Sequence, residues 1–241
     1  MNRFAILGYF VFFALSAQHI GAAESERGLA IAADVMDGGR FMLAAQEEPQ
    51  LTVVCFLGTE CPLARLYGPR LDGIASDFDP AAVRFVGVFS NRQDSSEDIS
   101  EFVREYDISF PTIRDDENRI ADAYGAQRTP EVFVVDSSLS IRSHGRVDDQ
   151  YLPGVARSTP ERHDLRLALT ELTSGESVSV SQTEVAGCLI GRVKVARADA
   201  SVTYCDQVVR ILNRHCVECH RSGEIGPFAL TDYDEVVGWS D

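Results

Sequence analysis

Two largely apolar runs, 51–57 (LTVVCFL) and 83–89 (VRFVGVF), place the strongest constraint on the fold of this 241-residue chain. Runs of this length that are rich in β-branched residues are typical of strands buried on both faces of a parallel sheet. Parallel strands need a crossover connection, and leucine and isoleucine recur at near-helical spacing between the two runs. We therefore predict a helix over 62–76, with Pro62 in its first turn, and an α/β domain built on a central sheet.

The alternation of helices and strands continues after the second run. We predict helices over 95–106, 116–124 and 159–172, and strands over 110–113, 131–136 and 140–144. The domain is expected to cover residues 24–174. A polar stretch, SGESVSVSQT, then begins a linker that we place at 175–200, and a short, mostly helical segment is expected over 201–241.

Composition excludes several classes of function. The formal net charge is −15, and 45% of the residues are hydrophobic, as in ordinary globular proteins. An acidic chain lacks the basic face that binds phosphates, so we expect no nucleic-acid partner. The sequence contains neither a P-loop nor a dinucleotide fingerprint, so no nucleotide cofactor is expected.

The first 23 residues have the pattern of a secretory signal peptide. Arg3 precedes an apolar stretch, and Gly21 and Ala23 are the small residues before a cleavage site. We expect the chain to be exported to the periplasm or cell envelope. The alternative is an uncleaved membrane anchor, which also exports the rest of the chain. Export permits disulfide bonds and covalent attachment of haem.

Cys61 is the candidate reactive thiol. It lies in the turn GTECP, between a predicted strand and a predicted helix, and the N-terminus of a helix stabilises a thiolate. The neighbouring Glu60 disfavours the anion and Arg65 offsets that effect, so the sequence leaves the net sign open. Cys55 lies within an apolar run and is expected to be a core residue.

The segments LTVVCFL, GTECPLA and TPEVFVVD (129–136) together resemble the redoxin branch of the thioredoxin superfamily, the alkyl hydroperoxide reductase and thiol-specific antioxidant group. The resemblance implies a thioredoxin-like fold, a cis Pro130 beside the active cysteine, and a Thr129 backbone that meets a bound thiol. The chain departs from the Cys-x-x-Cys pattern because residue 64 is Ala. Peroxiredoxins carry a Pro and a Thr at fixed positions before their reactive cysteine, whereas Gly58 lies three residues before Cys61 and Thr59 is one residue closer. Thr59 and Arg128 are the candidate substitutes for the peroxide-binding groups.

A cysteine that cycles between thiol and disulfide needs a partner. Cys188 lies just after the polar stretch and is our first candidate to resolve a disulfide on Cys61. Cys205 is the second.

The sequence CVECH forms a second constellation, with Cys216, Cys219 and His220. Two thiols at this spacing bond to haem, and the following histidine is placed to ligate the iron. We therefore predict covalent haem c. The alternatives are a zinc site completed by His215, Cys205 and Cys188, and a structural Cys216–Cys219 disulfide.

Residues 202–215 and Gly226-Pro227 resemble the corresponding parts of small c-type cytochromes. The residues after His220 include neither Met nor His for the second axial position. We therefore expect an incomplete cytochrome c-like segment, completed by further residues or by another chain. A redoxin domain followed by CxxCH resembles multidomain exported proteins of planctomycete-type bacteria.

Three functional hypotheses follow. The leading one is an exported thiol-based oxidoreductase with a haem-bearing segment, acting in redox chemistry or electron transfer on a thiol or disulfide substrate or a redox partner protein. The second is a peroxiredoxin-like antioxidant that reduces peroxide through Cys61. The third is a non-catalytic thioredoxin-fold binding or electron-carrier module.

Overall fold

A mixed five-stranded sheet forms the centre of the protein in the computed structural model, which describes residues 30–193, 200–226 and 228–239. The predicted signal peptide and Pro227 lie outside these residues. The strand order is β5-β4-β3-β7-β8. The five strands are β3 (Leu51–Leu57), β4 (Val83–Phe89), β5 (Thr112–Arg114), β7 (Glu131–Val135) and β8 (Ile141–Gly145). The first three run parallel to one another, and β7 and β8 are antiparallel to their neighbours.

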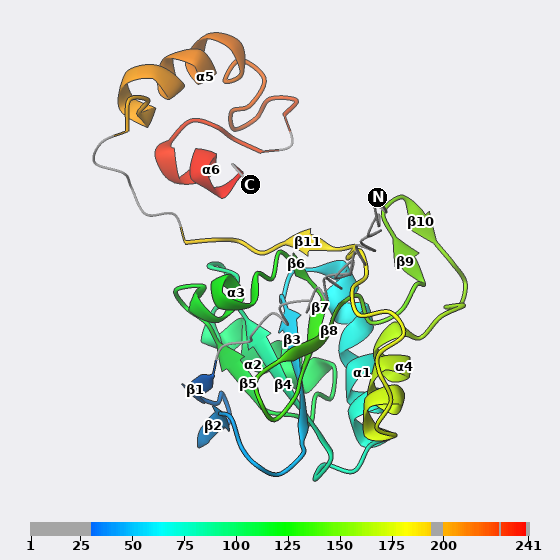
Figure 1. Ribbon diagram of the computed structural model, residues 1–241. Coiled ribbons are helices and arrows are strands. Elements are labelled where there is room, and N and C mark those ends of the chain that lie inside the picture. The colour runs from blue at the N-terminus through cyan, green and yellow to red at the C-terminus, as the bar shows by residue number, and fades with distance from the viewer. Residues whose placement is uncertain (1–29, 194–199, 227, 240–241) are drawn as a thin grey trace, which may run out of the picture.

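Both faces of the sheet are covered (Figure 1). One face packs against α1 (Pro62–Ser76), α2 (Ser96–Glu105) and α4 (Asp164–Thr173). The opposite face packs against α3 (Arg119–Tyr124) and the hairpin of β1 (Ile31–Asp34) and β2 (Arg40–Leu43). This two-sided burial explains why β3 and β4 are apolar at every position except Thr52 and Arg84, rather than alternating.

The predicted domain is therefore confirmed as an α/β thioredoxin-like fold. The predicted strands at 51–57 and 83–89 and the helix at 62–76 coincide with β3, β4 and α1. The strand predicted at 110–113 corresponds to β5, which begins two residues later, at Thr112. The helix predicted at 116–124 corresponds to α3, which begins three residues later, at Arg119. The hairpin β1–β2 was not predicted.

The last helix of the domain begins later than the sequence suggests. We predicted 159–172, whereas α4 begins at Asp164. The carboxylate of Asp149 accepts hydrogen bonds from the backbone N–H groups of Glu161 and Arg162, at 2.8 and 2.9 Å. These amides are therefore bound by a distant side chain in a non-helical segment, and the helix starts beyond them.

Two short pairs complete the domain. A hairpin joins β9 (Tyr151–Leu152) to β10 (Val155–Ala156), and β11 (Cys188–Leu189) pairs antiparallel with β6 (Arg128–Thr129). The segment that we predicted as a linker, 175–200, therefore includes a strand. Ile190, directly after β11, is only 4% exposed and packs in the core beneath β3.

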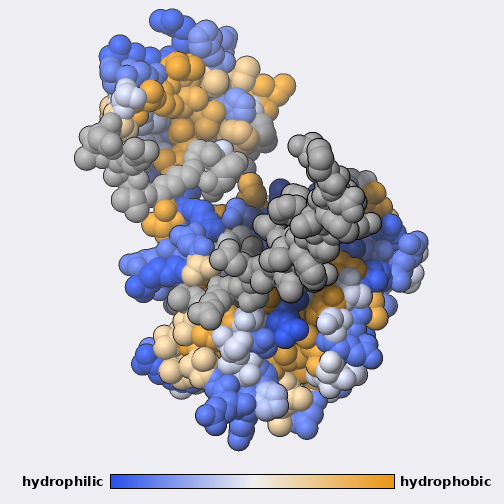
Figure 2. Space-filling model, in the orientation of Figure 1, coloured by the Kyte–Doolittle hydropathy of each residue, from blue (hydrophilic) through white to orange (hydrophobic). Residues whose placement is uncertain are grey.

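The C-terminal segment has a different character. It contains a π-helical turn (Tyr204–Val208), α5 (Val209–His215) and α6 (Tyr233–Gly238). None of its described residues, 200–226 and 228–239, is buried, and large apolar side chains such as Ile211 and Trp239 are more than half exposed. Figure 2 shows apolar residues gathered on its surface. In the described parts of the chain, no helix combines the length and apolarity that crossing a membrane would need.

The helix α1 offers a matched test of core packing. Leu71 is fully buried and Leu66, on the same helix, is 53% exposed. We expect Leu71→Ala to lower the free energy of unfolding by about 2–5 kcal/mol, because it removes buried methyl groups and leaves a cavity. Leu66→Ala should change it by less than about 0.5 kcal/mol. Urea unfolding of both variants, followed by circular dichroism, measures the difference.

Candidate functional site

Cys61 lies where β3 ends and α1 begins. It is the N-cap residue of α1, and Pro62 follows in the first turn. Its side chain is only 3% exposed, and its Sγ–H donates to the backbone carbonyl of Thr129 at 2.9 Å. The Thr129–Pro130 peptide bond is cis, as the redoxin resemblance implies. The structure therefore brings Cys61 together with Thr129 and Pro130, which are 68 and 69 positions away.

Cys188 lies beside the same backbone. In the β11–β6 pair, Cys188 is directly opposite Thr129. The thiol and the backbone N–H of Cys188 both belong to the hydrogen-bonding environment of the Cys61 sulfur. Both cysteines are free thiols in the structure. Of the two candidate partners, the structure thus brings Cys188 to Cys61, whereas Cys205 lies exposed in the C-terminal segment.

The two thiols have different acidities. Burial raises the pKa of Cys61, but hydrogen bonds from the Thr129 hydroxyl and from the N–H groups of Cys188 and Ala64 outweigh it, so that pKa lies below its ordinary value. Burial, hydrogen bonding with Cys61 and repulsion by its charge raise the pKa of Cys188 to about 11. Cys61 is therefore the thiol that ionises first and the better nucleophile near neutral pH.

The hydroxyl of Thr129 helps to lower the pKa of Cys61. Its oxygen is buried and has no hydrogen-bond partner among the described residues while Cys61 is a thiol that donates to the carbonyl. Once Cys61 loses its proton, the hydroxyl can donate to the sulfur anion, which favours ionisation.

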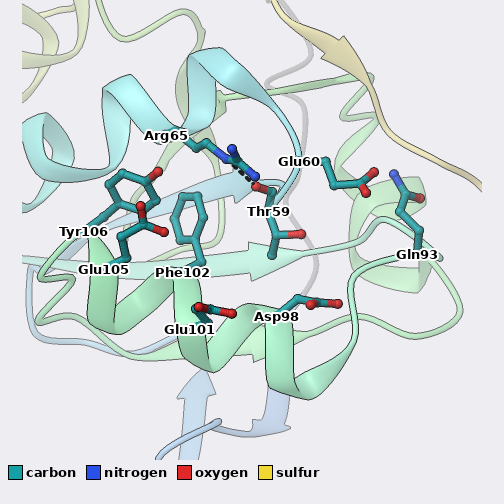
Figure 3. A pocket seen from close by; sticks show the side chains of 9 residues that line it. All are labelled: Thr59, Glu60, Arg65, Gln93, Asp98, Glu101, Phe102, Glu105 and Tyr106. Carbon is teal, nitrogen blue, oxygen red and sulfur yellow. Dashed lines mark hydrogen bonds between the residues drawn. The ribbon is translucent and has the colours of Figure 1, made fainter.

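Glu60 and Arg65 do not decide the acidity of Cys61. Arg65 Nε donates to the carbonyl of Thr59 at 2.8 Å. Glu60 and Arg65 both line an acidic pocket of about 340 Å³, together with Asp98, Glu101 and Glu105 (Figure 3). The Cys61 side chain is not among the residues that line the pocket. The direction of the pKa shift of Cys61, which the sequence left open, is therefore set by burial and by hydrogen bonds from Thr129, Cys188 and Ala64.

A polar network that the sequence analysis missed joins the two cysteine-bearing segments. Thr59 Oγ1 donates to Asp94 Oδ1 at 2.6 Å, and Asn91 Nδ2 donates to Asp94 Oδ2 at 2.9 Å. Asn91 Oδ1 in turn accepts from the N–H of Gly191 at 2.9 Å. Burial raises the pKa of Asp94, and the bonds from Thr59 and Asn91 oppose that rise. The sequence could have indicated this network through the position of the loop alone. The parallel strands β3 and β4 end at the same edge of the sheet, so the loop after β4 starts beside the turn after β3.

Thr59 and Arg128 have structural partners. The Thr59 hydroxyl is bound to Asp94, and Arg128 Nη1 donates to the carbonyl of Gly187 at 2.6 Å. Both groups therefore have hydrogen-bond partners within the protein, and the peroxide-binding role that the sequence analysis considered stays a prediction. Arg128 fastens the residue that precedes Cys188.

Cys216, Cys219 and His220 lie together just after α5. The N–H groups of Cys219 and His220 both donate to the carbonyl of Cys216, at 3.1 and 2.9 Å, so the motif forms one tight turn. Both cysteines are free. His220 Nδ1 is 3.1 Å from the carbonyl of Phe228, and the tautomer that donates there leaves Nε2 able to ligate a metal. The residues present therefore fit a covalent haem.

The zinc alternative has no comparable geometry. In the described part of the chain, no three His, Cys, Asp or Glu side chains come close enough together to hold a metal ion. His215, Cys205 and Cys188 therefore do not join the CxxCH cysteines in a common cluster.

Comparison with known sequences agrees with the fold. Residues 28–144 match the sequence model of the AhpC/TSA family. This domain is an AhpC/TSA redoxin. Thiol-disulfide oxidoreductase ResA of Halalkalibacterium halodurans is 24% identical over 106 residues, which are 44% of this chain and 56% of that protein. The match thus spans about half the length of this curated relative.

Two crystal structures resemble the redoxin over a longer range. A hypothetical protein from Sinorhizobium meliloti 1021 is 26% identical and superposes with a TM-score of 0.63, covering 71% of this chain and 95% of that one. An uncharacterised conserved protein from Geobacillus kaustophilus is 27% identical, with the same TM-score, and the comparison covers 71% and 93% of the two chains. Both therefore share the fold of this domain.

The acidity of Cys61 gives a prediction for this redoxin. Alkylation of Cys61 by iodoacetamide should rise with pH around a midpoint below that of an ordinary thiol, because the thiolate reacts and the pKa of Cys61 is lowered. Thr129→Val should move the midpoint upward, because the hydroxyl donor is lost. Peptide mass mapping after timed alkylation measures both. Thr112→Val, at a buried threonine of β5, is the control and should leave the midpoint unchanged.

Proposed function

We propose that the protein is an exported thiol–disulfide oxidoreductase in which Cys61 is the nucleophile and a thiol or disulfide of a partner molecule is the substrate. The observation that carries the proposal is the position of Cys61 at the N-terminus of α1, against the Thr129 carbonyl, with a lowered pKa. A thiolate stabilised in this way attacks a disulfide sulfur and forms a mixed disulfide. The activity named for the ResA relative supports the same chemistry.

The peroxidase alternative receives less support. Peroxide reduction needs groups that bind and polarise the peroxide beside the thiolate, and the two candidates, Thr59 and Arg128, are bound to Asp94 and Gly187. The non-catalytic alternative is disfavoured by the acidity of Cys61, since a scaffold gains nothing from a stabilised thiolate.

Replacement of Cys61 tests the proposal. With dithiothreitol as the electron donor, the parent protein should speed the reduction of oxidised glutathione and of insulin disulfides. We expect Cys61→Ser to lose this acceleration, so that the rate equals that of dithiothreitol alone. Cys55→Ser is the control, because Cys55 is fully buried in β3 and burial raises its pKa. Turnover that persists in Cys61→Ser would refute the assignment.

We further propose that the C-terminal segment carries a covalent haem on Cys216 and Cys219, with His220 as an iron ligand. The support is the turn geometry, the hydrogen bond between His220 Nδ1 and Phe228, and the exposed apolar side chains around it. A haem bound there would supply one-electron chemistry. The role of this chain's own residues is to hold it by two thioethers, to orient the imidazole through Phe228, and to cover it with apolar side chains.

The haem proposal predicts a mass and a spectrum. Full-length protein exported from cells with a cytochrome c maturation system should carry the added mass of one haem and a haem absorbance that survives denaturation. Cys216→Ala combined with Cys219→Ala should remove both signals. Cys205→Ala, at a nearby exposed cysteine, should retain them. An unmodified mass for the parent protein in such cells would contradict the proposal.

A further inference from the structure

We infer that Cys188 is the resolving cysteine of this redoxin, so that the catalytic disulfide joins the N-cap of α1 to the separate strand β11. The inference rests on the proposed role of Cys61 as nucleophile. It gives the protein a two-cysteine site, although residue 64, where a Cys-x-x-Cys motif would have its second thiol, is Ala.

The placement of Cys188 depends on a close approach of two backbones. Gly187 has a φ of +140°, and a Cβ built on it would lie 2.1 Å from the Thr129 carbonyl oxygen. Only glycine permits this contact, because any side chain would force the two segments apart. The same carbonyl accepts from Cys61 Sγ, so the close approach brings Cys188 to the sulfur that it would attack.

Several anchors hold the Cys188 segment on both sides of the cysteine. On one side, Arg128 Nη1 donates to the Gly187 carbonyl. On the other side, the N–H of Ile190 donates to the Gln127 carbonyl and Asn91 holds Gly191, both at 2.9 Å. The segment is thus fixed beside the site, and Leu189 and Cys188 themselves remain exposed.

This arrangement also controls access. Cys61 is nearly inaccessible, whereas β11 pairs with β6 over two residues only. Access of a substrate disulfide to the Cys61 sulfur would therefore require this short strand to move aside. The anchors at Ile190 and Gly191 keep Cys188 within reach, so the segment can return after the first step.

The chemistry balances in two steps. The Cys61 thiolate attacks one sulfur of the substrate disulfide, whose other sulfur leaves as a thiolate and takes up a proton. Cys188 then loses its proton, attacks the Cys61 sulfur and displaces the second substrate thiolate, which is also protonated. The substrate disulfide gains two electrons and two protons, and the protein dithiol becomes the Cys61–Cys188 disulfide.

The order of the steps follows from the charges. Cys61 raises the pKa of Cys188 both by hydrogen bonding and by its negative charge, while Arg128 lowers it. A Cys61 sulfur in a mixed disulfide has no charge, so the burial of the thiol, the opposing effect of the Glu60 carboxylate and the favourable effect of Arg128 on the pKa of Cys188 remain. Cys188 therefore becomes a better nucleophile after Cys61 has reacted.

Mass mapping of the full-length protein tests the pairing. The reduced protein is treated with oxidised glutathione, quenched with acid, alkylated and digested. The parent protein should yield a peptide pair linked through Cys61 and Cys188. Cys188→Ser should accumulate glutathione on Cys61, at least about tenfold more than the parent, because the resolving step is lost. Cys205→Ser should give the same linked pair as the parent.

The outcomes separate the two proposals. Linkage of Cys61 to another cysteine, or equal glutathione on Cys61 in the parent and in Cys188→Ser, overturns the pairing and leaves the role of Cys61 intact. Absence of both glutathione and a disulfide on Cys61 in every variant overturns the proposed function together with the pairing.

Gly187→Ala provides a second test that retains both thiols. We expect it to reduce the yield of the Cys61–Cys188 pair and to increase glutathione on Cys61, because the added methyl group displaces β11 from Thr129. Gly154→Ala is the matched control, since Gly154 also has a positive φ, +74°, and its Cβ would meet nothing within 4 Å. Unchanged linkage in Gly187→Ala, with a melting temperature equal to that of Gly154→Ala, would overturn the proposed placement.

Discussion

The Thr129 carbonyl is the point on which the thiol site depends. It accepts the hydrogen bond from Cys61 Sγ, and the backbone of Gly187 packs against it from the adjacent strand. A carbonyl at this place holds the thiol form of Cys61, while the hydroxyl of the same residue and nearby N–H groups stabilise the thiolate. Thr129 thus fixes the position of Cys61 and determines how closely Cys188 approaches it.

The sheet makes this arrangement rigid. β3 is buried from Thr52 to Leu57 between parallel β4 and antiparallel β7, so the turn that follows it has little freedom. Asp94 and Asn91, at the end of β4, then tie the Thr59 turn to the segment beyond β11. Buried, hydrogen-bonded polar groups of this kind stabilise one arrangement, because a broken bond would leave a buried partner unsatisfied.

The C-terminal segment is organised by other forces. The stacked rings of Phe228 and Trp239, with centroids 4.3 Å apart, and the contact of Phe228 with His220 hold it together, but it has no buried residue among those described. An apolar surface without a core needs a further apolar partner to exclude water. Within this segment, the proposed haem would supply that partner.

The sequence by itself determined the α/β class, the strands β3 and β4, the helix α1 and the place of Cys61 in the turn between β3 and α1, because hydrophobic periodicity and turn residues are local signals. It also named Cys188 as a candidate partner, but only from its place in the chain. The tertiary structure decided that β11 pairs with the redoxin domain, that Thr59 and Arg128 are hydrogen-bonded to Asp94 and Gly187, and that Asp94 joins the two segments. These features depend on hydrogen bonds between residues 35 to 100 positions apart, which no local pattern encodes. The acidity of Cys61 was likewise open in the sequence, since it results from burial opposed by donors that only the fold brings to the sulfur.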